Sequence, residues 1–119
     1  MNEKQKLGVF GEKLAREYLM RQGYEILDAN VKIGYQELDI VAERGGYLVF
    51  VEVKTRLSQA YGDGSEAMSP RKQRALRQAV SKYLTLKNWW HKEPRGDLIL
   101  ILVDKYRKKA KVRHFEDIL

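Results

Sequence analysis

Three charged side chains, Asp39, Glu52 and Lys54, stand at a spacing that could place them on one face of a β-hairpin. Two carboxylates are ligands of the kind that Mg²⁺ or Mn²⁺ takes in proteins, and such an ion polarises a phosphoryl oxygen and acidifies a bound water. An adjacent ammonium group can position the nucleophile or neutralise developing charge. The three groups could therefore hydrolyse a phosphodiester, although acid–acid–lysine clusters on a solvated sheet face are also common in a chain with 33% charged residues.

The hairpin is predicted from the Gly45-Gly46 pair, which separates two strand-like segments, residues 36–43 and 47–55. A turn centred on these glycines sets Asp39 opposite Glu52. Because side chains alternate across a sheet, the charged positions then share one face.

The same register sets Glu37 opposite Lys54 and makes Glu37 the expected partner of that lysine. The other face is then wholly apolar at six positions, namely Leu38, Ile40, Ala42, Val49, Val51 and Val53. A three-residue turn would instead set Asp39 beside Val51 and would place charges opposite core residues. The hydrophobic pattern favours the first register.

Carboxylates that face each other across a strand pair repel, so Asp39 and Glu52 need compensation. Lys54 lies two residues beyond Glu52, roughly 6.6 Å along the strand, and supplies part of it. A bound divalent cation would supply more. Asp39 and Glu52 are therefore candidate metal ligands, and Lys54 is a candidate catalytic group.

The remaining elements are predicted from hydrophobic periodicity and from turn residues. We expect a helix that begins at a Ser69 cap, a polar and mobile loop before it, and a strand at 97–103 that is buried on both faces. The full prediction is an α/β fold in the order α-β-β-β-α-β-β, with a mixed sheet flanked by helices. It forms one domain of residues 1–119. The predicted elements are a helix over 7–21, strands over 24–31, 36–43 and 47–55, a loop over 57–69, a helix over 69–88, and strands over 97–103 and 112–115.

The composition indicates which class of partner the protein binds and excludes several kinds of site. Lys and Arg exceed Asp and Glu by 23 to 16, a net charge of +7, which favours nucleic acid first and acidic membrane surfaces second. The absence of cysteine excludes disulfides, thiolate zinc sites and a cysteine nucleophile. No apolar stretch is long enough to span a membrane and no signal peptide is recognisable, so we expect a cytoplasmic protein.

Several basic side chains could contact phosphates. Arg71, Lys72 and Arg74 lie on the second predicted helix, where a solvated helix face is the other interpretation. Arg56 directly follows the strand of Glu52 and Lys54 and is better placed to reach a phosphate. The basic segment 105–113 fits a nucleic-acid arm or a soluble loop equally well.

Aromatic and histidine residues carry weaker signals. Trp89 and Trp90 could stack on bases, but a core or dimer contact is the favoured interpretation. His91 and His114 lack partner ligands at metal-binding spacing, and we expect both to be structural.

The run Glu37-Leu38-Asp39-Ile40-Val41, followed by Val49 to Arg56, resembles the PD-(D/E)xK nuclease signature. With the first-helix motif Gly11-Glu12-Lys13-Leu14-Ala15, the chain resembles the YraN-like family of bacterial proteins over nearly its whole length. That family is similar to the archaeal Holliday-junction resolvases and shares the restriction-endonuclease-like fold.

The resemblance implies a metal-dependent DNA endonuclease, acting on branched or otherwise structured DNA with Mg²⁺ or Mn²⁺. Asp39 and Glu52 would be metal ligands, Lys54 the catalytic lysine, and Glu12 a further acid that completes the site. Resolvases act as dimers, which allows a homodimer here, although the residues identify no dimer face.

Two departures from the family pattern affect packing and not this set: Gln36 stands where glycine is usual and Gly96 where an aromatic is usual. Two alternatives stay open. One is a non-catalytic nucleic-acid-binding module of the same fold that acts with a partner protein. The other is a protein-interaction domain.

Overall fold

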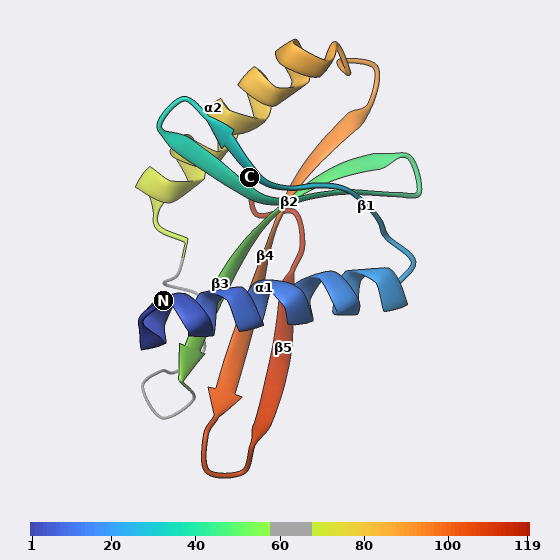
Figure 1. Ribbon diagram of the computed structural model, residues 1–119. Helices are drawn as coiled ribbons and strands as arrows, with labels where there is room; N and C mark the ends of the chain where they lie inside the picture. Colours follow the sequence, from blue (N-terminus) through green and yellow to red (C-terminus); the bar gives the residue numbers. More distant parts are fainter. Residues whose placement is uncertain (58–67) are drawn as a thin grey trace.

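The structure, a computed structural model, describes residues 1–57 and 68–119. The described residues form one five-stranded sheet in the order β1-β2-β3-β4-β5, in which β3 and β4 are parallel and the other neighbours antiparallel. The expected order α-β-β-β-α-β-β and the mixed sheet flanked by helices are confirmed (Figure 1). The elements are α1 (Glu3–Arg21), β1 (Glu25–Ile33), β2 (Gln36–Arg44), β3 (Tyr47–Leu57), α2 (Pro70–Lys87), β4 (Glu93–Asp104) and β5 (Lys109–Phe115).

Both helices begin at side-chain caps. Asn2 accepts a hydrogen bond from the Gln5 backbone, and the Gln5 side chain accepts one from the Asn2 backbone, so α1 begins four residues before the predicted start. The predicted Ser69 cap of α2 is confirmed, and Asn88 ends this helix in the left-handed conformation with φ of 57°. Residues 58–67 of the loop expected over 57–69 lie outside the described residues.

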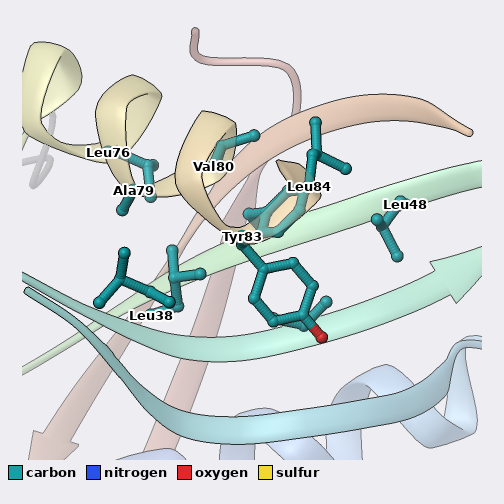
Figure 2. Close-up of a cluster of buried hydrophobic side chains, with 10 residues drawn as sticks. Leu38, Leu48, Leu76, Ala79, Val80, Tyr83 and Leu84 are labelled. Carbon is teal, nitrogen blue, oxygen red and sulfur yellow. The ribbon is translucent and has the colours of Figure 1, made fainter. Parts of the chain in front are cut away.

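One core lies between α2 and the sheet (Figure 2). Tyr83 reaches from the helix to Phe50 of β3, with ring centroids 5.5 Å apart and the rings edge to face. Leu38 and Val41 of β2 belong to this core together with Leu48, Leu76, Ala79, Val80 and Leu84.

A second core lies between α1 and the opposite face of the sheet, where Ala15 and Leu19 pack on β2, β3 and β4. Gly11 brings the helix close to β3, because a Cβ atom at this position would lie 1.8 Å from Thr55 Oγ1. Phe10, next to Gly11 in α1, is 45% exposed.

The strand predicted at 97–103 is confirmed as buried on both faces, with Leu98 to Ile101 at most 2% exposed. It begins earlier, at Glu93, because β4 pairs in parallel with the whole of β3 from Tyr47 onward. Gly96 has a packing role at this place. A Cβ atom there would lie 2.3 Å from Leu119 Cδ1, so the C-terminal leucine fills the space that a larger residue would take.

Candidate functional site

The predicted register of the β2–β3 hairpin is confirmed from Ile40, which pairs with Val51, to Arg44, which pairs with Tyr47. The ladder then ends, and Asp39 does not pair directly with Glu52 as predicted. The Asp39 carboxylate instead accepts a hydrogen bond from the Val53 backbone N–H at 2.8 Å. A side chain takes the place of a main-chain partner where the strands separate.

The side-chain alternation of β2 also breaks at this point. Leu38 and Val41 both face the α2 core, whereas Ile40 and Ala42 face the α1 core. The predicted six-residue apolar face is therefore wrong at Leu38. Asn30, in the part of β1 alongside this break, has a left-handed backbone with φ of 53°.

Three carboxylates from α1 and β2 meet beside the break. Glu12, Glu37 and Asp39 each have an oxygen within 4.8 Å of the others. Glu37 was predicted to be the partner of Lys54, but Lys54 Nζ lies 3.2 Å from an oxygen of Glu52 instead. The break in the alternation of β2 places Glu37 beside Glu12 of α1. Glu37 therefore belongs with Glu12 and Asp39 to what we call the acidic cluster.

The acidic cluster is electrostatically frustrated. Burial and the charges of Glu52, Glu12 and Glu37 together raise the pKa of Asp39 to about 7, against the lowering effect of the hydrogen bond from the Val53 N–H. Burial and the charge of Glu37 also raise the pKa of Glu12. The Asn30 amide, in the orientation that satisfies its hydrogen bonds, donates to both Glu12 oxygens at 3.1 and 3.0 Å.

Lys54 and Lys72 are in contact on the α2 side of the site. Burial acts to lower the pKa of Lys54, but the contact with Lys72 and the charge of Glu52 raise it overall, so Lys54 is an ammonium ion at neutral pH. The same contact with Lys54, together with burial, lowers the pKa of Lys72. Lys72 and Glu52 line a small cavity of about 170 Å³ with Glu37. The sequence placed Lys72 among phosphate-contacting groups, and its position beside Lys54 was not foreseen.

The other predicted nucleic-acid residues are spread more widely. Arg56 lines a cleft of about 500 Å³ together with Glu12, Glu37 and Lys54. Arg71 and Arg74 are exposed near the start of α2, the helix that carries Lys72. The structure therefore brings Arg56 and Lys72 to the acidic cluster.

The tryptophan pair lies away from the cluster. Trp89 packs against Tyr83 with ring centroids 6.0 Å apart, and Trp90 is exposed at the start of the connection to β4. That connection leads to Glu93, which pairs with Tyr47 at the opposite end of β3 from Glu52 and Lys54. The favoured core interpretation holds for Trp89.

A second charged cluster surrounds Asp97, which is fully buried. Arg95 donates two hydrogen bonds to it, at 3.0 and 2.8 Å, His114 donates one at 2.7 Å and the Asp117 backbone donates one at 3.0 Å. Tyr18 lies 2.9 Å from the other ring nitrogen of His114. His114, expected to be structural, is thus part of a network that ties α1, β4, β5 and the C-terminal segment together.

Only one of these clusters fits a divalent metal ion among the residues that the structure describes. Carboxylate oxygens of Asp97 and Glu116 and a ring nitrogen of His114 are also close enough to converge on an ion, but Arg95 already pairs with the carboxylates of Asp97 and Glu116. The Asp39 cluster offers oxygen ligands alone, and its carboxylates repel one another. That donor set suits Mg²⁺ or Mn²⁺.

Comparisons with known proteins agree on a family. Similar chains include UPF0102 proteins from three bacteria. That of Syntrophomonas wolfei is 43% identical over 91% of this chain and 92% of its own. Those of Flavobacterium psychrophilum and Carboxydothermus hydrogenoformans are 41% and 36% identical, over 98% and 100% of this chain and 96% and 98% of theirs.

Among solved structures, a XisH family protein from Nostoc punctiforme matches 88% of this chain and 98% of its own, with 14% identity and a TM-score of 0.39. That likeness is too distant to assign an activity. Neither α1 nor α2 is long and apolar enough to cross a membrane. The model of the uncharacterised protein family UPF0102 matches residues 11–101, and the expected YraN-like membership is confirmed: the chain belongs to the UPF0102 family.

Proposed function

We propose that this protein is a metal-dependent DNA endonuclease that hydrolyses phosphodiesters of branched or otherwise structured DNA. The observation that carries the proposal is the environment of Asp39. This carboxylate is half-buried among Glu12, Glu37 and Glu52, so that its pKa is raised to about 7, and the ammonium group of Lys54 lies 3.2 Å from an oxygen of Glu52. Such perturbed pairs of acids are typical of functional sites.

Asp39 and Glu52 would hold Mg²⁺ or Mn²⁺, with Glu12 of α1 as a further ligand. Burying like charges without a counter-ion costs free energy, and a divalent cation offsets that cost. When bound, the ion supplies a Lewis acid and lowers the pKa of a coordinated water.

Residues of the chain would position the metal ligand, the catalytic lysine and the phosphate. The Val53 N–H fixes the orientation of the Asp39 carboxylate. Glu52 holds Lys54 in place, and the raised pKa of Lys54 keeps it cationic, so it stabilises negative charge on the phosphate and does not act as a general base. Arg56, on the rim of the same cleft, contacts a neighbouring phosphate.

Lys72, Arg71 and Arg74 extend the basic surface along the start of α2. Lys72, in contact with Lys54, lies nearest to the reacting phosphate. The net charge of +7 supports a polyanionic substrate.

A cleavage assay tests the proposal. The full chain is incubated with labelled branched, flapped, single-stranded and duplex DNA in Mg²⁺, in Mn²⁺ and in EDTA. We expect cleavage of at least one structured substrate with a divalent ion and none in EDTA. Lys54→Ala should abolish cleavage, while Lys13→Ala, an exposed lysine on α1, serves as the matched control and should leave it intact.

Two results would contradict the proposal. If all four substrates stay uncut in both ions, the protein is not an endonuclease for them. If Lys54→Ala cleaves as the wild type does, the activity comes from another site or from a contaminant. DNA binding that persists without cleavage and is indifferent to Lys54→Ala would instead support the non-catalytic binding module.

A further inference from the structure

The cleft beside the acidic cluster continues along the first half of α1. Most of its lining residues come from α1 and the end of β3, two elements that pack together, and Asn30 and Glu37 complete the lining. Lys4, Gly8 and Glu12 recur at four-residue spacing, so they line the cleft from one helix face. Glu12 belongs to the acidic cluster, which makes this face a direct route away from it.

The packing of the described residues does not require glycine at position 8. Glycine inside a helix destabilises it relative to alanine. At Gly11 the contact with Thr55 requires glycine, but a Cβ atom built on Gly8 meets nothing within 4 Å among the described residues. Among the described residues, nothing packs against the bare helix surface at Gly8, and this part of the cleft is open.

A second cleft, of about 420 Å³, adjoins the first and shares Lys4 and Leu7 with it. Phe10, Lys6 and Lys105 also line it, and Phe10 is 45% exposed. Three lysines face a single acid, Glu3, in this cleft. An exposed aromatic ring among lysines is the combination that binds single-stranded nucleic acid, because bases stack on the ring and phosphates pair with the cations.

The size of the two clefts fits a single strand. Volumes of about 500 and 420 Å³ are in the range of pockets for small ligands, so each has room for a nucleotide. We propose that a single DNA strand leaves the acidic cluster along α1, with its backbone against Gly8, its phosphates on Lys4 and Arg56, and a base stacked on Phe10.

The inference rests on the proposed function and specifies its substrate: DNA with a single-stranded segment next to the cleavage point. A flap, a tail or an opened branch provides such a segment. A continuous blunt duplex does not.

Binding without cleavage tests this path. Fluorescence anisotropy in EDTA compares a labelled single strand, a duplex with a single-stranded tail and a blunt duplex. We expect the first two to bind more tightly than the blunt duplex. Phe10→Ala should weaken binding of the single strand and of the tailed duplex by roughly fivefold or more, with little effect on the blunt duplex. Met20→Ala, which removes another exposed apolar side chain of α1, is its control.

A steric block gives an independent test. Gly8→Leu should raise the melting temperature, because leucine favours the helix and meets no atom of the chain at its Cβ, yet it should weaken single-strand binding. Lys4→Ala should weaken it as well, with Lys13→Ala as the control. A Gly8→Leu variant that melts at a higher temperature but binds the single strand more weakly has a blocked cleft and an intact fold.

The path is wrong if the Phe10, Gly8 and Lys4 variants bind the single strand as the wild type does. It is also wrong if they lose blunt-duplex binding equally, if the blunt duplex binds best, or if no DNA binds. Metal-dependent cleavage that disappears in Lys54→Ala would sustain the proposed function even then, because that assay does not depend on the path.

Discussion

Asp39 and Asp97 are two aspartates on neighbouring parts of one sheet with opposite surroundings. Asp97 is fully buried, and Arg95, His114 and a backbone N–H donate to its carboxylate. Asp39 receives one backbone N–H and otherwise faces carboxylates. Burial alone would raise the pKa of both. The donors around Asp97 lower its pKa overall, whereas the charge of Glu52 adds to the effect of burial and brings the pKa of Asp39 to about 7.

The difference separates a structural carboxylate from one for which we propose a bound cation. Every donor around Asp97 comes from the chain, so the network is complete when the protein folds. Among the described residues, Asp39 itself has no cation as a salt-bridge partner, Arg16 acts on Glu12 only from a distance, and Lys54 is already paired with Glu52. Frustration of this kind is retained where it serves a function.

The largest expected effect is the loss of the Asp97 network. Asp97→Ala should lower the free energy of unfolding by about 3–5 kcal/mol, because it leaves the His114 ring without its carboxylate partner and leaves Arg95 with only the exposed Glu116 as a counter-charge. Urea unfolding followed by circular dichroism measures it. A loss below about 1 kcal/mol, the value of an ordinary hydrogen bond, would show that the network is not structural.

Asp39→Asn should have the opposite sign. In the metal-free protein at pH 8 the ionised Asp39 destabilises the fold, and a rise in its pKa from 3.8 to about 7 corresponds to at most about 4 kcal/mol. Solvent that reaches the cluster reduces this, so we expect Asp39→Asn to stabilise the protein by about 2 kcal/mol in EDTA. Urea unfolding that finds the variant less stable would contradict the frustrated cluster.

The same two residues predict opposite pH dependences. The folded pKa of Asp39 lies above its unfolded value, so its contribution is fully present below about pH 4 and is lost as the pH rises through about 7. The pKa of Asp97 is lowered, so its contribution is present above about pH 4 and is lost as the pH falls below that. Stability of the metal-free protein should decline between about pH 4 and 7 in the wild type and decline less in Asp39→Asn, as measured by melting temperature.

Glu12→Gln sharpens the comparison at the edge of the acidic cluster. Burial and Glu37 raise the pKa of Glu12, but water reaches this side chain, so removing its charge should stabilise the metal-free protein by less than about 1 kcal/mol. The matched substitution Glu17→Gln, at another partly exposed acid of α1, should change stability less. Equal gains from both substitutions would point to the net charge and not to the cluster.

Glu116→Gln should have the smallest effect. Glu116 pairs with Arg95 at 3.1 Å, but its side chain is 57% exposed, and such pairs are worth roughly 0–1 kcal/mol. A change of less than about 0.5 kcal/mol in urea unfolding is expected. A loss as large as that of Asp97→Ala would mean that the network extends to the surface.

Sequence patterns predicted the elements well because their causes are local. Gly45-Gly46 sets the turn and the hydrophobic alternation sets the register from Ile40 to Arg44. Ser69 and Pro70 set the start of α2. The alternation failed where a side chain replaced a ladder partner, at Asp39 and Val53, because strand periodicity cannot anticipate that exchange.

The sequence predicted which residues lie at the site but not which of them are in contact. Asp39, Glu52, Lys54 and Glu12 do gather at one place. The break in the side-chain alternation of β2 has no marker in the sequence. Because of it, Glu37 lies beside Glu12 and Asp39, and Lys54 pairs with Glu52.

The Asp97 network was missed because its members lie far apart in the chain. His114 is seventeen residues from Asp97, and Tyr18 is ninety-six from His114. The polar Arg95-Gly96-Asp97 triplet at the head of a buried strand was the available signal, since a buried charge requires partners.

Direct measurement of Mn²⁺ binding tests the central claim most sharply. Isothermal titration calorimetry is performed on the wild type, on Asp39→Asn and on Glu116→Gln, in each case with the full chain at pH 8. We predict saturable Mn²⁺ binding to the wild type and to Glu116→Gln, and its loss in Asp39→Asn. No binding to the wild type, or undiminished binding to Asp39→Asn, would contradict the account.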